Sequence, residues 1–205
     1  MKPLRRPLAA LLTAALAVAL IAAPAAAKQQ VGPRVKVDGK ALPAPDAETF
    51  ATSDDQAIGR MPPTLVGEGF NEQPVTIAHG DAPRIVILLS HSCPHCQAEV
   101  PVIVDLAEEG VFDGIDVQAV TTNTSRDLTN YPPSKWLKRE QWPYKPVLAD
   151  DRQLRSLVAL GGTSFPYMLF VAADGTVAGR WSGELGASTW RGVAEALLEG
   201  RSLYE

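Results

Sequence analysis

The chain has 205 residues, of which 46 % are apolar and 20 % are charged, as in an ordinary globular protein. This length allows one domain with extensions and a core that needs no disulfide staples. The formal net charge of -4 offers no basic surface, so we expect no nucleic-acid partner.

The first 27 residues have the order of a secretory signal peptide. Three basic residues near the start are followed by an uncharged run over 8–23 and then by small alanines at 25–27, which suit cleavage. An uncleaved membrane anchor is the alternative, although the run is short for a bilayer span. We therefore expect export to the periplasm, the cell envelope or the medium, and keep the anchor open.

The rest of the chain divides into two parts. Residues 28–60 are rich in Pro, Asp, Ala and Ser with little hydrophobic periodicity, which predicts a flexible linker. From residue 61 the pattern sharpens, so we assign 61–205 to one folded domain. Short apolar segments at Thr64–Val66 and Val75–Ile77 flank turn residues and predict a β-hairpin at its start.

A conspicuous motif follows a buried strand. Residues 84–90 form a largely apolar, β-branched run, typical of a strand covered on both faces. The Cys93-Pro94-His95-Cys96 tetrapeptide comes soon after it, and apolar residues then recur at helical spacing until Gly110. The motif therefore lies at a strand-to-helix turn, with Cys93 at the helix start.

The second half continues the alternation of strands and helices. Strands are predicted over 115–121, 147–148, 167–171 and 177–181, and helices over 133–141, 152–160 and a last segment ending at Glu199. Asp174-Gly175 is typical of a tight hairpin turn. The candidate helix caps are Ser134, Asp150 or Asp151, and Ser188 or Thr189. This order of elements predicts a three-layer α/β domain.

Both cysteines of the chain lie in the tetrapeptide. Disulfides persist outside the cytoplasm, but one between residues this close closes almost no loop and stabilises little. The purpose of the pair is therefore chemical. Unpaired N–H groups and the dipole at a helix start favour a thiolate, which is the nucleophile of disulfide exchange. We expect Cys93 to be the exposed, attacking sulfur and Cys96 the resolving thiol.

The two residues between the cysteines fit this chemistry. Pro94 suits the helix start because its missing N–H would have no partner there. His95 can place a proton or partial positive charge near the Cys93 sulfur, which would make the disulfide a stronger oxidant. No bound cofactor is needed, because the dithiol itself carries the two electrons.

Three alternatives to disulfide exchange exist for the cysteine pair: a structural zinc site, copper binding and peroxide reduction. A structural zinc site needs four ligands, and the chain has no second cysteine pair, so we expect no metal. A copper metallochaperone that binds through the cysteine pair stays open as a binding protein. A thiol peroxidase would need a Thr and a Pro upstream of its attacking Cys, and residues 86–92 contain neither.

The residues from Cys93 to Pro101, CPHCQAEVP, resemble the CxxCxxExP pattern of the TlpA/ResA/DsbE-like thioredoxins. Residues 161–171 with the following Asp-Gly turn are similar to the loop, proline, strand and turn of that family, and the resemblance covers 61–200. It implies a thioredoxin-like α/β/α sandwich with a mixed central sheet and an N-terminal hairpin extension. It also implies an enzyme, a thiol–disulfide oxidoreductase acting through a Cys93–Cys96 disulfide.

The resemblance extends to three further residues. The family proline that matches Pro166 is cis and faces the redox pair, which leaves the backbone of Phe165 free to pair with a substrate peptide. The family acid that matches Glu99 is thought to help move protons. A buried Glu99 with a raised pKa would accept the proton of Cys96, and a solvated surface Glu is the alternative.

The chain also departs from the family pattern. His91 and Ser92 precede Cys93 where typical members have a Trp next to the cysteine, and they either hydrogen-bond the thiolate or lie exposed in the loop. Phe165 is bulkier than the usual Thr or Val, which alters the expected substrate groove. Trp136 and Trp142 could line a substrate surface, but packing over the sheet is the favoured prediction.

The direction of the reaction stays open in the sequence. A Pro-His dipeptide between the cysteines is seen in strongly oxidising DsbA-like proteins, whereas the framework that carries Glu99 resembles reductases of cytochrome c maturation. The expected partners are thiols and disulfides of exported proteins, together with a membrane or extracytoplasmic redox partner.

Overall fold

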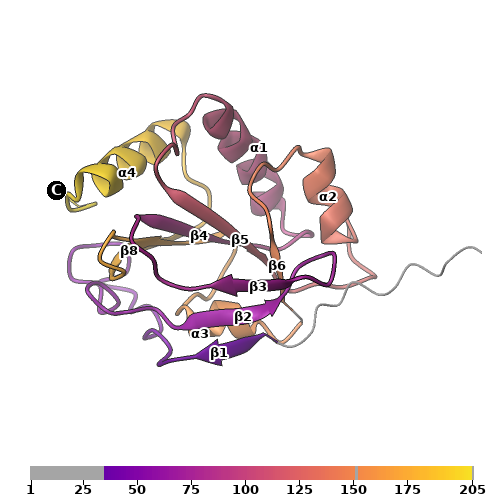
Figure 1. The fold of residues 1–205 in the computed structure, drawn as a ribbon, viewed down its shortest axis with the longest axis horizontal. Helices are drawn as coiled ribbons and strands as arrows, with labels where there is room; N and C mark the ends of the chain where they lie inside the picture. The colour runs from indigo at the N-terminus through magenta and orange to yellow at the C-terminus, as the bar shows by residue number, and fades with distance from the viewer. Residues whose placement is uncertain (1–34, 151, 205) are drawn as a thin grey trace, which may run out of the picture.

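The computed structural model describes residues 35–150 and 152–204. They form a five-stranded mixed sheet and a three-stranded antiparallel sheet (Figure 1). The predicted signal segment, 1–27, lies outside the described residues. Within the described ranges, no helix combines the length and apolar character that a membrane span requires.

The described elements follow the predicted alternation. The strands are β1 (Lys36–Asp38), β2 (Thr64–Glu68), β3 (Pro74–Ile77), β4 (Arg84–Leu89), β5 (Asp116–Thr121), β6 (Leu148–Ala149), β7 (Tyr167–Val171) and β8 (Val177–Ser182). The helices are α1 (Pro94–Glu108), α2 (Pro133–Arg139), α3 (Arg155–Ala159) and α4 (Ala187–Glu199). Helix α3 begins three residues later than predicted, because Leu154 before it has a φ of 57°.

The strand order is β6-β5-β4-β7-β8 in the five-stranded sheet and β1-β2-β3 in the three-stranded sheet. Strand β4 is the middle strand of the larger sheet, parallel to β5 and antiparallel to β7. All six of its residues are buried. Because side chains alternate across a strand, Ile85, Ile87 and Leu89 enter one hydrophobic cluster while Val86 and Leu88 enter the other. The continuous apolar run of the sequence is thus explained by burial on both faces.

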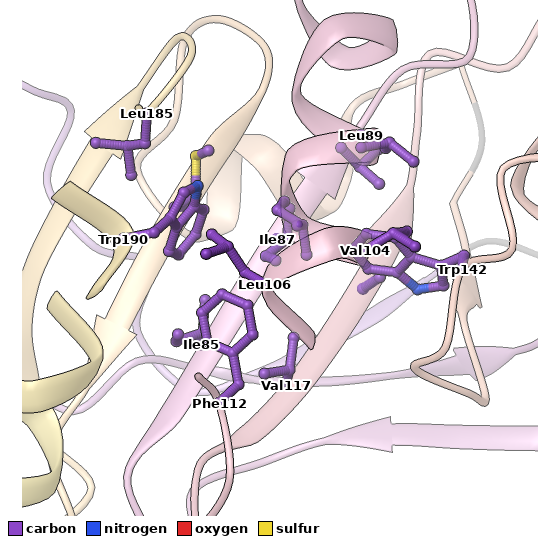
Figure 2. Close-up of a cluster of buried hydrophobic side chains, with 14 of the residues drawn as sticks. Ile85, Ile87, Leu89, Val104, Leu106, Phe112, Val117, Trp142, Leu185 and Trp190 are labelled. Atoms are coloured by element: carbon purple, nitrogen blue, oxygen red, sulfur yellow. The ribbon is translucent and has the colours of Figure 1, made fainter. Parts of the chain in front are cut away.

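The two faces of the five-stranded sheet have different covers. Helices α1, α2 and α4 cover one face, and their buried apolar side chains belong to the same hydrophobic cluster as Ile85 and Ile87. Figure 2 shows Leu106 of α1 and Trp190 of α4 in this cluster with Ile85 and Ile87. Helix α3 and the three-stranded sheet cover the other face. The three-layer thioredoxin-like arrangement is confirmed, and the predicted hairpin is β2 paired with β3.

The segment before the hairpin differs from the expected linker in its described part, residues 35–60. Strand β1 pairs with β2, and Val35, Leu42 and Ala57 are buried in the second cluster. Asp55 forms a buried ion pair with Arg180 of β8. These contacts come from isolated residues without a local period, so the sequence pattern did not reveal them.

The predicted helix caps were mostly wrong. Helix α2 is preceded by Pro132 and α4 by Gly186, and neither has a side-chain cap. Asp150 does bind the first turn of α3, because its Oδ2 accepts a hydrogen bond from the Ser156 N–H at 2.8 Å. The N-cap position itself is occupied by Leu154. The other candidate, Asp151, lies outside the described residues.

Candidate functional site

The Cys-x-x-Cys motif lies at the turn from β4 into α1, as predicted. Cys93 is the cap residue of α1, with extended backbone angles, and Pro94 occupies the first helical position. The Cys93 N–H donates to the Ser90 carbonyl at 3.1 Å, and the Cys93 carbonyl accepts from Gln97 at 3.1 Å. Cys93 thus lies where the helix dipole favours a thiolate, and its side chain makes no capping hydrogen bond to the first turn.

The two free thiols differ in exposure. Cys93 is half-buried, whereas Cys96 is fully buried, and the backbone N–H of Ser90 donates to the Cys96 sulfur at 3.4 Å. Burial strongly raises the pKa of Cys96, and the neighbouring Cys93 and Glu99 raise it further. A substrate sulfur can thus reach Cys93 first, while Cys96 needs help to lose its proton.

The loop before β7 faces the redox pair. The Phe165–Pro166 peptide bond is cis, in agreement with the resemblance. The Cys93 thiol donates to the Phe165 carbonyl at 3.6 Å, a long bond acceptable for sulfur. Phe165 is half-buried, Pro166 is buried, and the Gly183 N–H donates to the Pro166 carbonyl at 2.8 Å. The tertiary structure thus brings Cys93 and Phe165 together from 72 residues apart.

Glu99 is buried rather than solvated, with 1 % of its surface exposed. Its Oε1 accepts the indole N–H of Trp190 at 2.5 Å, and its Oε2 accepts the backbone N–H of Leu185 at 3.0 Å. Burial raises the pKa of Glu99, the two donors oppose the rise, and nearby Glu184 adds to it. Of the two interpretations of Glu99, the structure therefore excludes the solvated surface residue.

His95 projects from the first turn of α1 into solvent. Its Nδ1 lies 2.6 Å from Oε1 of Glu184, in a pair whose side chains are 67 % and 49 % exposed. A pair this open contributes little to stability. The imidazole that we expected to bring a proton or partial positive charge near the Cys93 sulfur thus has a carboxylate beside it. No motif in the sequence indicated Glu184.

His91 has a role that neither sequence interpretation foresaw. It is fully buried; its Nδ1 lies 2.5 Å from the Thr129 carbonyl, and its Nε2 lies 3.2 Å from the Ser125 N–H. The carbonyl must accept and the amide must donate, so the ring is neutral with its proton on Nδ1. Burial accordingly lowers the pKa of His91. His91 holds the 122–131 loop beside the motif.

The remaining predicted residues are placed as follows. Ser92 lies beside Ser90, with the two hydroxyl oxygens 3.4 Å apart. Trp136 and Trp142 are almost fully buried in the core that contains α1, which confirms packing as their role. In the described ranges no group of three or more His, Cys, Asp or Glu side chains is arranged to hold a metal ion.

Comparisons with known proteins give similarity in structure but not in sequence. No protein-family model matches the chain, and no curated protein matches its sequence. A thiol:disulfide interchange protein of the thioredoxin family from Chlorobium tepidum TLS is similar with a TM-score of 0.54 and 19 % identity, over 78 % of this chain and 99 % of that one.

Two further solved structures are similar to this chain in fold. A secreted Mycobacterium tuberculosis disulfide oxidoreductase, homologous to E. coli DsbE, has a TM-score of 0.54 and 15 % identity, over 64 % of this chain and 95 % of that one. An uncharacterised conserved protein from Geobacillus kaustophilus has a TM-score of 0.59 and 20 % identity, over 72 % and 85 %. The chain therefore has the thioredoxin-like fold of the TlpA/ResA/DsbE-type thiol:disulfide oxidoreductases.

Proposed function

We propose that this protein exchanges disulfides with protein thiols through Cys93 and Cys96. One observation carries the proposal: half-buried Cys93 occupies the N-cap position of α1, the thiol of Cys96 in the same turn is buried, and the Phe165 carbonyl lies 3.6 Å from the Cys93 sulfur. This is the arrangement that disulfide exchange requires, since one sulfur must be reachable and the other protected. The solved structures with this fold, several of them thiol:disulfide interchange proteins, support a general redox role.

In the reducing direction the reaction has two displacements. The Cys93 thiolate attacks one sulfur of a substrate disulfide, forms a mixed disulfide and expels the other substrate sulfur, which takes up a proton. Cys96 then loses its proton and attacks the Cys93 sulfur, so that the Cys93–Cys96 bond forms and the second substrate thiol leaves. Two electrons pass from the dithiol to the substrate. Oxidation of a substrate dithiol is the same sequence in reverse.

The neighbouring residues have assigned parts in this scheme. Glu99, one turn after Cys96 on α1, accepts the Cys96 proton, and its burial and raised pKa support that role. His95 tunes the reduction potential, with Pro94 setting the start of the helix. Phe165 and Pro166 form the contact with the substrate backbone, because the Phe165 carbonyl already lies at the attacking sulfur.

We infer that the substrates are exported proteins and that an extracytoplasmic or membrane protein restores the redox state. The signal-peptide pattern of residues 1–27 supports this location, as does the secreted oxidoreductase among the proteins of similar fold. In such a compartment structural disulfides form and are corrected.

The test is catalysis of insulin reduction by dithiothreitol, followed as turbidity. Cys93→Ser should lower the rate to the uncatalysed level, because no sulfur is left to attack. Cys96→Ser is the matched change: reduced, freed of dithiothreitol and then mixed with insulin, it should still attack and should trap a mixed disulfide that gel electrophoresis without reductant reveals. A Cys93→Ser variant as active as the wild type, or the absence of a trapped species with Cys96→Ser, would overturn the proposal.

The direction follows from the equilibrium of the pair with glutathione. A reduction potential near that of DsbA, about −120 mV, assigns the protein to disulfide formation, and one near thioredoxin, about −270 mV, assigns it to reduction.

A further inference from the structure

The buried carboxylate of Glu99 is held by two donors that come from one distant segment. Leu185 in the loop after β8 supplies its backbone N–H, and Trp190 in α4 supplies its indole N–H. All three residues are nearly or fully excluded from solvent. Each oxygen of the carboxylate thus accepts one hydrogen bond from this segment.

We propose that Trp190 is a positioning residue for Glu99: its indole N–H, together with the Leu185 N–H, holds the carboxylate ready to accept the Cys96 proton and sets the pH at which it can. The proposal rests on the proposed function, since it takes Glu99 as the proton acceptor. It adds a residue that no sequence motif indicated.

The surroundings of Trp190 keep the indole in place. Its ring meets Phe112 edge-on, with centroids 5.5 Å apart and planes at 90°, and meets Phe170 in the same way at 6.0 Å and 89°. Figure 2 shows Trp190 in the core together with Leu185 and Phe112. Because both ring contacts come from the rigid core, the N–H cannot turn away from Glu99 without disturbing that packing.

The electrostatic balance gives the direction of the effect. Burial and the negative charge of Glu184 favour the protonated form of Glu99, whereas the two N–H donors favour the carboxylate. Cys96 also interacts electrostatically with Glu99, and the donor that α4 contributes, the Trp190 indole, is uncharged. If the indole N–H is lost, Glu99 stays protonated to a higher pH and cannot accept the Cys96 proton below it.

The chain contains a matched control for this N–H group. Trp142 is as buried as Trp190 and belongs to the same core cluster. Its indole nitrogen has no hydrogen-bond partner in the described part of the protein. Trp190→Phe and Trp142→Phe therefore remove the same atoms from the same core, but only the first removes a donor from Glu99.

The experiment is a pH titration of the reduced protein labelled with ¹³C at the glutamate carboxyl carbons and followed by NMR, with Glu99 assigned from the signal missing in Glu99→Gln. Trp190→Phe should raise the pKa of Glu99 by about one to two pH units, the value of one hydrogen bond to a charged group. Trp142→Phe should leave it unchanged. An unchanged pKa of Glu99 in Trp190→Phe, or an equal rise of this pKa in Trp142→Phe, overturns the proposal.

A second measurement needs no folded variant. In the wild-type protein the Trp190 indole N–H resonance should titrate together with Glu99, while that of Trp142 should not follow it; an indole signal of Trp190 that ignores the Glu99 titration overturns the proposal. Neither NMR measurement involves an exchange partner. If the wild-type protein did not catalyse insulin reduction, the proposed function would fail. The NMR titrations would still show whether Trp190 controls the pKa of Glu99.

A third experiment connects Trp190 to the reaction: the rate at which Cys96 resolves the mixed disulfide is measured at several pH values in single-turnover experiments. The pH profile of this step should move upward in Trp190→Phe, and the shift should vanish in the Glu99→Gln background. A shift that persists without the carboxylate would mean that Trp190 acts through packing alone, and would overturn the proposal.

Discussion

At the scale of single residues, Glu99 shows how a site group acts on stability as well as on chemistry. Its carboxyl is buried, and burial raises its pKa despite two N–H donors. A group whose pKa is higher in the folded than in the unfolded chain binds more protons when folded. Its contribution to stability is therefore fully present below the unfolded pKa and is lost as the pH rises through the folded one.

We predict that Glu99→Gln removes this pH dependence. The unfolding free energy of the wild type, minus that of the variant, should fall as the pH rises from about 4.5, the ordinary pKa of Glu, by at most about 1.4 kcal/mol per pH unit. Urea unfolding of the reduced proteins between pH 4 and 8 measures it. Glu108→Gln changes an exposed residue of the same helix, and its difference in unfolding free energy from the wild type should not vary with pH. A difference for Glu99→Gln that does not vary with pH would contradict the prediction.

At the scale of elements, the imidazole of His91 helps to hold the 122–131 loop, together with Arg152, which donates to the Thr124 carbonyl. His91 accepts the Ser125 N–H and donates to the Thr129 carbonyl, and Tyr131 contacts its ring edge-on. The His91 carbonyl in turn accepts from the side chains of Gln97 and Asn130. The loop is thus joined to the start of α1, next to the redox pair, through a single buried residue.

Acid should loosen this loop. Because burial lowers the pKa of His91, the unfolded chain takes up a proton first, and stability is lost as the pH falls below about 6.5. We predict that His91→Phe destabilises the protein by about 1–3 kcal/mol at pH 7.5, since it leaves the Ser125 N–H and the Thr129 carbonyl unpaired. The deficit should shrink toward pH 5.

Chemical unfolding at several pH values measures both effects. His79→Phe is the control, because His79 is exposed and should leave the acid dependence of stability as in the wild type. A His91→Phe variant that keeps the full acid dependence would show that His91 is not its source.

At the scale of the whole molecule, Arg180 joins the N-terminal segment to the layer that carries the site. Its guanidinium forms two hydrogen bonds of 2.8 Å with Asp55 and donates to the carbonyls of Pro43 and Gly161. It also lies 5.5 Å from the centroid of the Phe50 ring. Gly161 has a φ of 73°, and a Cβ there would lie 2.6 Å from Arg180 Nη1, so only glycine fits before the loop that faces Cys93.

We predict that Asp55→Asn destabilises the protein by about 3–5 kcal/mol, because it leaves the buried Arg180 charge without its counter-charge. Although burial alone would raise the pKa of Asp55, the Arg180 guanidinium lowers it, which agrees with a carboxylate held ionised. Urea unfolding at pH 7 measures the loss. Asp54→Asn, at the exposed neighbouring position, should change stability by less than about 0.5 kcal/mol, and equal effects of the two changes would contradict the prediction.

Features that neighbouring residues encode could be predicted from the amino-acid sequence. The apolar run of β4, the cysteine pair at the start of α1 and the alternation of later strands and helices follow from local periodicity and turn residues. The cis bond before Pro166 followed from the resemblance of its segment to a known family.

The partners of the buried polar side chains, by contrast, could not be predicted before the fold was known. The Glu99 carboxylate is held by residues 86 and 91 positions away, Asp55 meets Arg180 across 125 positions, and His91 binds Thr129 across 38. Burial and partner choice depend on which surfaces meet when the layers pack, and a single buried polar residue leaves no period in the sequence. The cysteine pair and its place at a helix start are therefore encoded locally. The buried side chains that surround the pair and exchange protons with it are brought there by packing.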